Sequence, residues 1–196
     1  MQRWLKDNAQ VIIPKSKLVE EGSTSFPVPT PEFALILTLN HNFWHLLYEG
    51  VGMRQMMDLY FVLRAQKKNL SIKNEELAQF VDYFGLTTFA KASMWVMKEV
   101  FGLRDEILVC APDERSGRFL LDEILRAGNF GHADKRLKHG DNENRLVLMV
   151  RWLKHTWRLF RDYPADVLWT PIGVLYISLW RRWHYRFDHI ELNKRV

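Results

Sequence analysis

The sequence is poor in cysteine and in long apolar runs, and each absence removes a class of protein. Cys110 is the only cysteine among 196 residues, so the chain cannot form an internal disulfide, which suits a reducing compartment such as the cytoplasm. The longest uncharged apolar run, residues 167–180, has 14 residues and contains a proline and a glycine. A membrane-spanning helix needs about 20. The first ten residues contain no continuous apolar core, so we expect no signal peptide.

The familiar motifs of catalytic centres are also absent. No GxSxG, P-loop or GxGxxG pattern occurs, and no two aspartates are spaced as D-x-D. Cys110 has no catalytic partner pattern, so we expect it to be inert. The net charge of +5 and the pI near 9.3 allow binding to phosphates or to an acidic surface. The arginines are scattered rather than clustered, so we do not expect nucleic-acid binding.

Helical periodicity, in contrast, is present along most of the chain from residue 31. Apolar residues recur at intervals of three and four, Thr30-Pro31 and Asp113 are typical of helix starts, and Gly85 and Gly102 are typical of helix ends. We therefore expect an all-α fold, with roughly seven helices in one compact bundle-like domain over residues 31–196. The expected helices are 31–49, 53–67, 71–85 (starting at 71 or 74), 87–101, 113–127, 143–162 and 171–186, with a short turn or helix at 164–170.

The first 30 residues differ in character from the rest. Residues 1–8 resemble the last turns of a helix whose beginning is missing. Residues 11–31 contain four prolines and predict a connector, in which residues 11–13 form a short strand. We expect residues 1–30 to be the tail of a preceding domain followed by this connector.

The run from His41 to Leu63 combines polar side chains with a glycine corner. Gly50-Val51-Gly52 predicts a tight corner between two helices, because glycine tolerates a positive φ. Arg54 and Asp58 follow one helical turn apart and share a face. Two interpretations remain open: a buried or half-buried ion pair that fixes the corner, or an Arg54 that binds a phosphate or carboxylate while Asp58 orients it.

Two further groups invite a ligand interpretation. His41 and His45 are four residues apart and share a helix face, but the glutamate of HExxH and a third ligand are both missing. We therefore expect no metal site; one histidine packs in the core and the other hydrogen-bonds a backbone group or a phosphate. The loop Gly128-Asn129-Phe130-Gly131 is by default a helix C-cap and turn, and a phosphate cradle is the alternative.

The pattern G-x-G-M-R-Q-x-x-D (Gly50, Gly52, Met53, Arg54, Gln55, Asp58) resembles the helical C-terminal half of an uncharacterised bacterial nucleotidyltransferase family, often encoded near polysaccharide-synthesis genes. Residues 84–102 and 120–131 are similar to it as well, so the resemblance covers most of the chain from about residue 27. Such enzymes hold phosphates with a Gly-Ser turn and two magnesium ions with paired aspartates, and this chain lacks both. The resemblance thus implies Mg²⁺ and a nucleoside triphosphate for the intact family protein, and no cofactor in this chain.

The resemblance also implies a function. The chain would be a helical domain that closes over the nucleotide or acceptor and is catalytically silent alone. Arg54 would contact phosphate, Gln55 and Asp58 would orient it, and His41, His45 and the Gly128–Gly131 loop would support the pocket. Its partner would be the catalytic half, missing or on a separate chain, and an apolar face that this half leaves uncovered would favour homo-oligomers.

An alternative comes from a different class of protein. The C-terminal residues 180–186 interleave arginine with tryptophan, as in helices that lie on membrane surfaces. On this interpretation the chain is a helical interaction module, and the basic aromatic helix docks on an anionic membrane surface or a partner protein.

Overall fold

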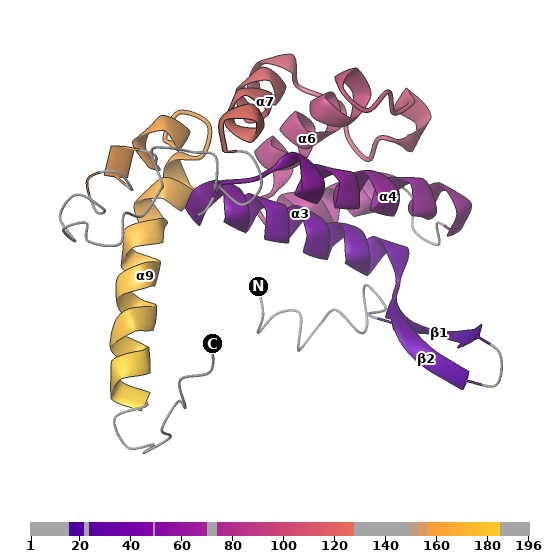
Figure 1. The fold of residues 1–196 in the computed structure, drawn as a ribbon, viewed down its shortest axis with the longest axis horizontal. Coiled ribbons are helices and arrows are strands. Elements are labelled where there is room, and N and C mark those ends of the chain that lie inside the picture. Colours follow the sequence, from indigo (N-terminus) through magenta and orange to yellow (C-terminus); the bar gives the residue numbers. More distant parts are fainter. Residues whose placement is uncertain are drawn as a thin grey trace. The chain divides into compact units, whose positions relative to one another are not determined.

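The computed structural model describes residues 16–21, 24–48, 50–69, 74–127, 150, 153–154 and 156–184 (Figure 1). The chain divides into two compact units, Met1–Trp152 and Leu153–Val196. The domain division at residue 30 stays a prediction. The expected helix at residues 1–8 and strand at 11–13 lie outside the described residues.

Helices make up most of the described chain, which confirms the all-α class. The first unit contains the strands β1 (Ser16–Glu21) and β2 (Thr24–Pro29), the helices α3 (Pro31–Tyr48), α4 (Met53–Asn69), α5 (Asn74–Tyr83), α6 (Thr87–Glu99) and α7 (Glu114–Ala127), and the 3₁₀ turn η1 (Asp105–Ile107). The second contains α9 (Pro164–His184).

The antiparallel hairpin of β1 and β2 lies where the sequence predicted only a connector. Its register pairs Glu21 with Thr24, which places the sequence Gly22-Ser23 between the strands, a residue pair typical of two-residue hairpins. Pro27 and Pro29 lie opposite alternate residues of β1. Counted from the turn, both fall at positions that make no ladder hydrogen bond, so their missing N–H groups do not disrupt the pairing. The prolines, read as breakers, concealed this signal.

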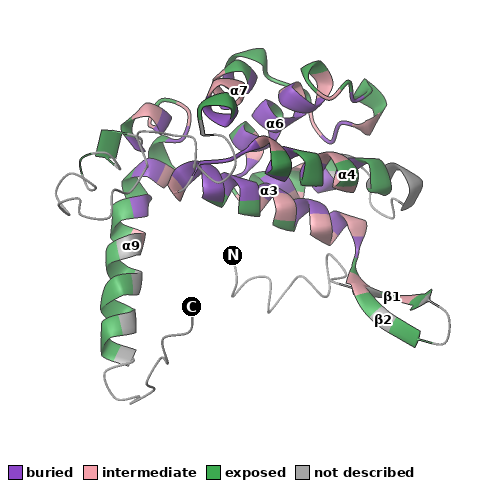
Figure 2. Ribbon diagram, viewed as in Figure 1, coloured by how far each residue is buried: buried purple, intermediate pink, exposed green. Residues whose placement is uncertain are grey.

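The core of the first unit comes from the apolar faces of its helices, where α3 packs on α4 and α6 packs on α7. Figure 2 shows the buried residues concentrated on α3 and α6. Phe43 of α3 meets Phe89 of α6 with ring centroids 5.3 Å apart, and both side chains are buried. Each fully buried side chain of this size contributes about 1.5–3 kcal/mol, so the helix pairs are held mainly by these apolar contacts.

Most helix ends fall where the sequence predicted them. Gly85 and Gly102 have φ angles of 69° and 66°, the left-handed conformation that ends a helix. Asp113 caps α7: its carboxylate accepts hydrogen bonds from the backbone N–H and the hydroxyl of Ser116. These bonds favour the ionised carboxylate and lower the pKa of Asp113.

Pro171 does not start the last helix, which corrects the prediction. It lies inside α9, whose first residue is Pro164. Proline is tolerated at a first helical position, where an N–H would have no intrahelical partner, but costs about 3 kcal/mol inside a helix. The hydroxyl of Thr170 donates to the carbonyl of Asp166 at 2.6 Å, one turn back.

Of the helix predicted at 143–162, residues 150, 153–154 and 156–159 are described as helical; its remaining residues before 156 lie outside the described residues.

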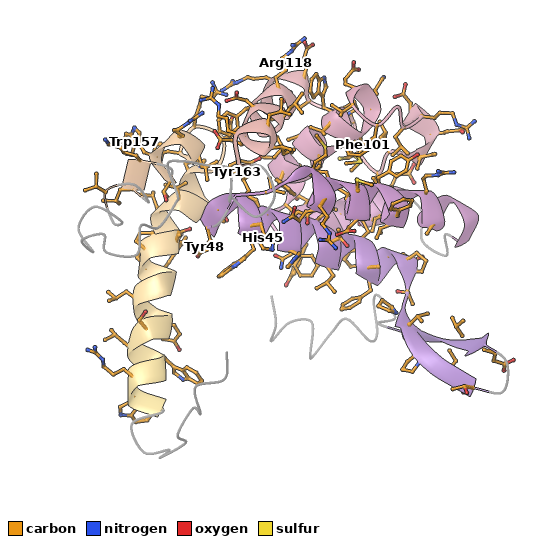
Figure 3. The ribbon with its side chains drawn as sticks, in the orientation of Figure 1. His45, Tyr48, Phe101, Arg118, Trp157 and Tyr163 are labelled. Atoms are coloured by element: carbon orange, nitrogen blue, oxygen red, sulfur yellow. The ribbon has the colours of Figure 1, made fainter. Side chains whose placement is uncertain are left out.

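Gly117 of α7 lies close against Trp95 of α6. A Cβ at this position would lie 2.5 Å from the Cβ of Trp95, and Arg118, labelled in Figure 3, lies 5.5 Å from the centroid of the same ring. We expect Gly117→Ala to destabilise the protein by about 1–3 kcal/mol, because an overpacked contact forces backbone shifts. A thermal melt would show this as a Tm lower by about 2–4 °C per kcal/mol.

Gly173 of α9 is the matched control for this substitution. A Cβ there meets nothing within 4 Å, so Gly173→Ala should not lower the Tm. Alanine's higher helix propensity should add up to about 1 kcal/mol to the free energy of unfolding. A Gly117→Ala protein as stable as Gly173→Ala would contradict the close packing of α6 on α7.

Candidate functional site

The connection between α3 and α4 is the glycine corner that the sequence predicted. Gly50 has a φ of 87°, a conformation that costs glycine little because it lacks a Cβ. Its N–H donates to the carbonyl of His45 at 2.6 Å and closes the end of α3. Val51 and Gly52 are buried beside it, so the corner belongs to the core.

Gln55 closes the start of α4. Its side-chain Oε1 accepts the backbone N–H of Gly52 at 3.1 Å, which is one half of a capping box. Gln55 is 3% exposed, and the described contacts of its side chain do not include Arg54. No described contact supports the expectation that Gln55 orients Arg54. The side chain of Gln55 instead stabilises the corner.

Asn42 joins the two helices across the corner. Its Nδ2 donates to the backbone carbonyl of Gln55 at 3.0 Å, and Asn42 is 1% exposed. The Nε2 of Gln55 is buried and has no hydrogen-bond partner among the described residues. Because burying polar groups is costly unless they are paired, the bonds that Asn42 and Gln55 do make select one arrangement of α3 and α4.

Arg54 and Asp58 lie on the outer face of α4. Both are exposed, and the described residues include no hydrogen bond or ion pair for either side chain. The buried or half-buried ion pair expected as one interpretation is therefore wrong, because a spacing of four places two side chains on one face without forcing them together. The guanidinium of Arg54 is open to an anion from solvent.

The two histidines of α3 contact each other. Their Nε2 atoms are 3.1 Å apart, and the rings meet edge-on with centroids 4.4 Å apart. His45, labelled in Figure 3, is 8% exposed, whereas His41 is exposed. One histidine thus packs in the core, as predicted, and the other bonds a side chain rather than a backbone group. No cluster of three or more His, Cys, Asp or Glu side chains suited to a metal occurs within the described residues.

Two other predicted features contribute little here. The loop Gly128-Asn129-Phe130-Gly131 lies outside the described residues, so its C-cap and phosphate-cradle interpretations stay predictions. Cys110 borders a shallow cavity of about 380 Å³ that also includes Lys98 and Asp105. Burial raises the pKa of the Cys110 thiol to about 11, which leaves little thiolate at neutral pH and agrees with an inert cysteine.

A second candidate surface, which sequence reasoning missed in part, runs along α9. Eight large apolar side chains between 44% and 68% exposed lie one or three residues apart, within an arc of about 140° of the helix. We call this set the α9 stripe: Leu168, Trp169, Ile172, Leu175, Tyr176, Leu179, Trp180 and Trp183. Figure 2 shows α9 as largely exposed. Only the tryptophans of the cluster at 180–186 were expected, because Pro171 concealed the helical period of the whole segment.

Across the described residues, no helix combines the length and the apolarity that crossing a bilayer requires.

The corner gives a testable stability difference. Asn42→Asp keeps the size of the side chain but replaces a hydrogen-bond donor with a carboxylate that faces a carbonyl. At pH 7 we expect a loss of more than about 1–3 kcal/mol in the free energy of unfolding, because the charge is buried without a partner. Burial raises the folded-state pKa of the new carboxyl above its unfolded value near 4, so the loss should shrink as the pH falls toward that value, where the protonated acid donates again.

Urea denaturation at pH 7 and near pH 4 measures this difference. Arg54→Ala is the control, because an exposed side chain without described partners should change stability by less than about 0.5 kcal/mol. Equal stability of Asn42→Asp and the parent protein at pH 7 would rule out the buried bond as the constraint on the corner.

Comparison with known proteins adds no relative. No protein-family model, curated protein or solved structure matches this chain. The resemblance to the nucleotidyltransferase family therefore stays a prediction.

Proposed function

We propose that this chain is a helical docking module that binds an anionic membrane surface through the α9 stripe. One observation carries the proposal: eight large apolar side chains on a single helix face are about half exposed or more. Contiguous apolar patches beyond a few hundred Å² are rare on soluble monomers and mark interaction surfaces. A helix of this kind binds with its apolar face in the headgroup region and its axis in the membrane plane.

The size of the stripe determines what it contributes to binding. Fully burying one such side chain contributes about 1.5–3 kcal/mol. Half of that for each of eight side chains is on the order of 6–12 kcal/mol before the costs of association. This gross gain is comparable to the cost of association, about 4–15 kcal/mol, so the charge described below contributes to the net affinity.

The chemistry of the stripe favours a lipid interface over a protein core. Trp169, Tyr176 and Trp183 each add a polar N–H or O–H group to an apolar ring, and all three are more than 65% exposed. In the headgroup region the ring is buried while the polar group stays hydrated. In a tight helix dimer these polar groups would each need a partner, which makes a second copy the weaker occupant.

Charge supplies the preference for anionic lipid. Arg182 is exposed near the end of α9, at about 20° from the edge of the stripe formed by Leu175 on the helical wheel. The sequence adds Arg181 and Arg186, and the net charge of the chain is +5. Each basic residue near an anionic surface contributes about 1 kcal/mol, an attraction that salt screens.

Vesicle sedimentation tests the proposal. The chain should pellet with vesicles of phosphatidylcholine and phosphatidylglycerol and much less with phosphatidylcholine alone, and high salt should reduce the difference. Leu175→Glu, midway along the length of the stripe, should weaken binding by about tenfold or more, because an apolar side chain is replaced by a charge that repels the surface.

Ser178→Glu is the matched control. Ser178 is exposed on α9 and lies away from the stripe, so the substitution adds the same charge without removing an apolar contact. Equal losses in the two variants would mean that only net charge matters. A stripe that instead mediates a dimer would appear as a concentration-dependent dimer, abolished by Leu175→Glu, without vesicle binding. Either result would overturn the proposal.

A second candidate is the nucleotide-closing domain that the family resemblance implies. The observation in its favour is Arg54, an exposed guanidinium on the first turn of α4 without described partners. His41 is also exposed, and the bond between Asn42 and Gln55 places the residues next to His41 and Arg54 in contact. On this proposal Arg54 contacts a phosphate of a nucleoside triphosphate, and the catalytic half supplies the reaction.

Titration with Mg²⁺–ATP tests this candidate. Arg54→Ala should weaken binding by about tenfold or more, since a charge-assisted hydrogen bond contributes about 1.5–3 kcal/mol. Arg64→Ala is the control on the same helix, because Arg64 already contacts the Tyr60 ring and hydroxyl. The chain alone should transfer no nucleotide. Identical affinities of the parent and both variants would remove Arg54 from any nucleotide site.

A further inference from the structure

We propose that His41 and His45 chelate a divalent transition-metal ion of the Zn²⁺ class through their two Nε2 atoms. This site does not involve the α9 stripe; it shares His41 with the nucleotide candidate but requires neither Arg54 nor a nucleotide. The two side chains come from one helix, one turn apart, and their Nε2 atoms already converge to 3.1 Å. Two imidazole nitrogens bound to one tetrahedral Zn²⁺ at 2.0–2.1 Å lie about 3.3 Å apart. Small side-chain rotations therefore suffice to place an ion between them.

The backbone holds the two donors ready for this ion. Both belong to α3, an 18-residue helix, so the spacing of their Cα atoms is fixed. His45 is held by burial, because it is 8% exposed, and its carbonyl accepts the N–H of Gly50 at the corner. His41 is exposed, which gives an ion access from solvent. Because one donor is already fixed and the other is accessible, little side-chain conformational entropy is lost when the ion binds.

The surroundings favour an imidazole ligand set. Between Glu32 and Tyr48 the sequence of α3 contains no lysine, arginine, aspartate or glutamate, so no charge on this helix repels the ion or competes with the histidines. Imidazole nitrogen suits Zn²⁺, Cu²⁺ and Ni²⁺, whereas Mg²⁺ prefers oxygen. The site thus differs in kind from the magnesium that the family resemblance implies for the catalytic half.

The protons of the pair can rearrange to admit the ion. In the present contact one Nε2 donates its proton to the lone pair of the other, so the two atoms share one proton. An ion between them requires both lone pairs, and each neutral ring then carries its proton on Nδ1. Binding therefore weakens in acid, where protons compete for the same lone pairs. Two histidines fill two positions of the ion, and water occupies the others.

Isothermal titration of the full chain with Zn²⁺ tests the site, with Mg²⁺ as a negative control. We expect one tightest site per chain at pH 7.5, weakened at pH 5.5. His41→Gln should reduce its affinity by about 100-fold, because the second donor of a chelate binds at a high effective concentration. His41 is exposed, so the variant should keep the fold, which circular dichroism checks.

The chain has seven histidines, so the site must be separated from the others. His184→Gln, which removes a histidine elsewhere, should leave the tightest site unchanged. Nitrogen-15 NMR of the imidazoles should show the Nε2 signals of His41 and His45 shifting together as Zn²⁺ is added. Unchanged affinity in His41→Gln, an effect of Mg²⁺ equal to that of Zn²⁺, or a shift of only one of the two Nε2 signals would overturn the proposal.

Discussion

The buried hydrogen bonds at the corner between α3 and α4 are the constraint on which the first unit depends. Gln55 uses its side chain to cap α4 and its carbonyl to accept Asn42. Both residues are almost fully buried, where a polar group without a partner is costly. The rotation of each helix is therefore fixed, and the neighbours of this pair, His41 and Arg54, are directed to the surface. The side chains available to a ligand are those that the corner does not use.

This constraint changes what the glycine-rich motif means. Gly50 supplies the positive φ, and Gly52 and Gln55 form the cap of α4. Each of these residues has a structural reason that requires no ligand. Arg54 and Asp58 have none, since both are exposed and make no described polar contact. Within the motif, a ligand would therefore depend on Arg54 and Asp58, whereas Gly50, Gly52 and Gln55 already build the corner.

The sequence predicted local features well and longer-range ones poorly, for physical reasons. Glycine at a helix end and aspartate at a cap act through their own backbone or the next turn, so Gly85, Gly102 and Asp113 were located correctly. Proline led to two wrong predictions. The prolines of β2 predicted a connector, but they occupy strand positions where no N–H is needed. Pro171 predicted the start of a helix, but it lies inside α9. His41 and His45 are four residues apart, as are Arg54 and Asp58, yet only the two histidines touch. Whether such a pair makes contact depends on side-chain rotamers and burial, which the spacing does not specify.

The helix α9 of the second unit buries few of its described side chains. Among the α9 side chains that the structure describes, only Val167 and Thr170 are buried, and both lie in its first two turns. Most of the stability of a helix in a protein comes from the packing of its apolar face rather than from helix propensity, and Pro171 lowers the stability of α9 further. The last three turns of α9 therefore need an apolar surface against which to pack. A lipid interface provides one, and the polar groups of its tryptophans and tyrosine can remain hydrated there. If the proposed function holds, the stripe that leaves the free helix without a packing surface is also what makes binding to the membrane favourable.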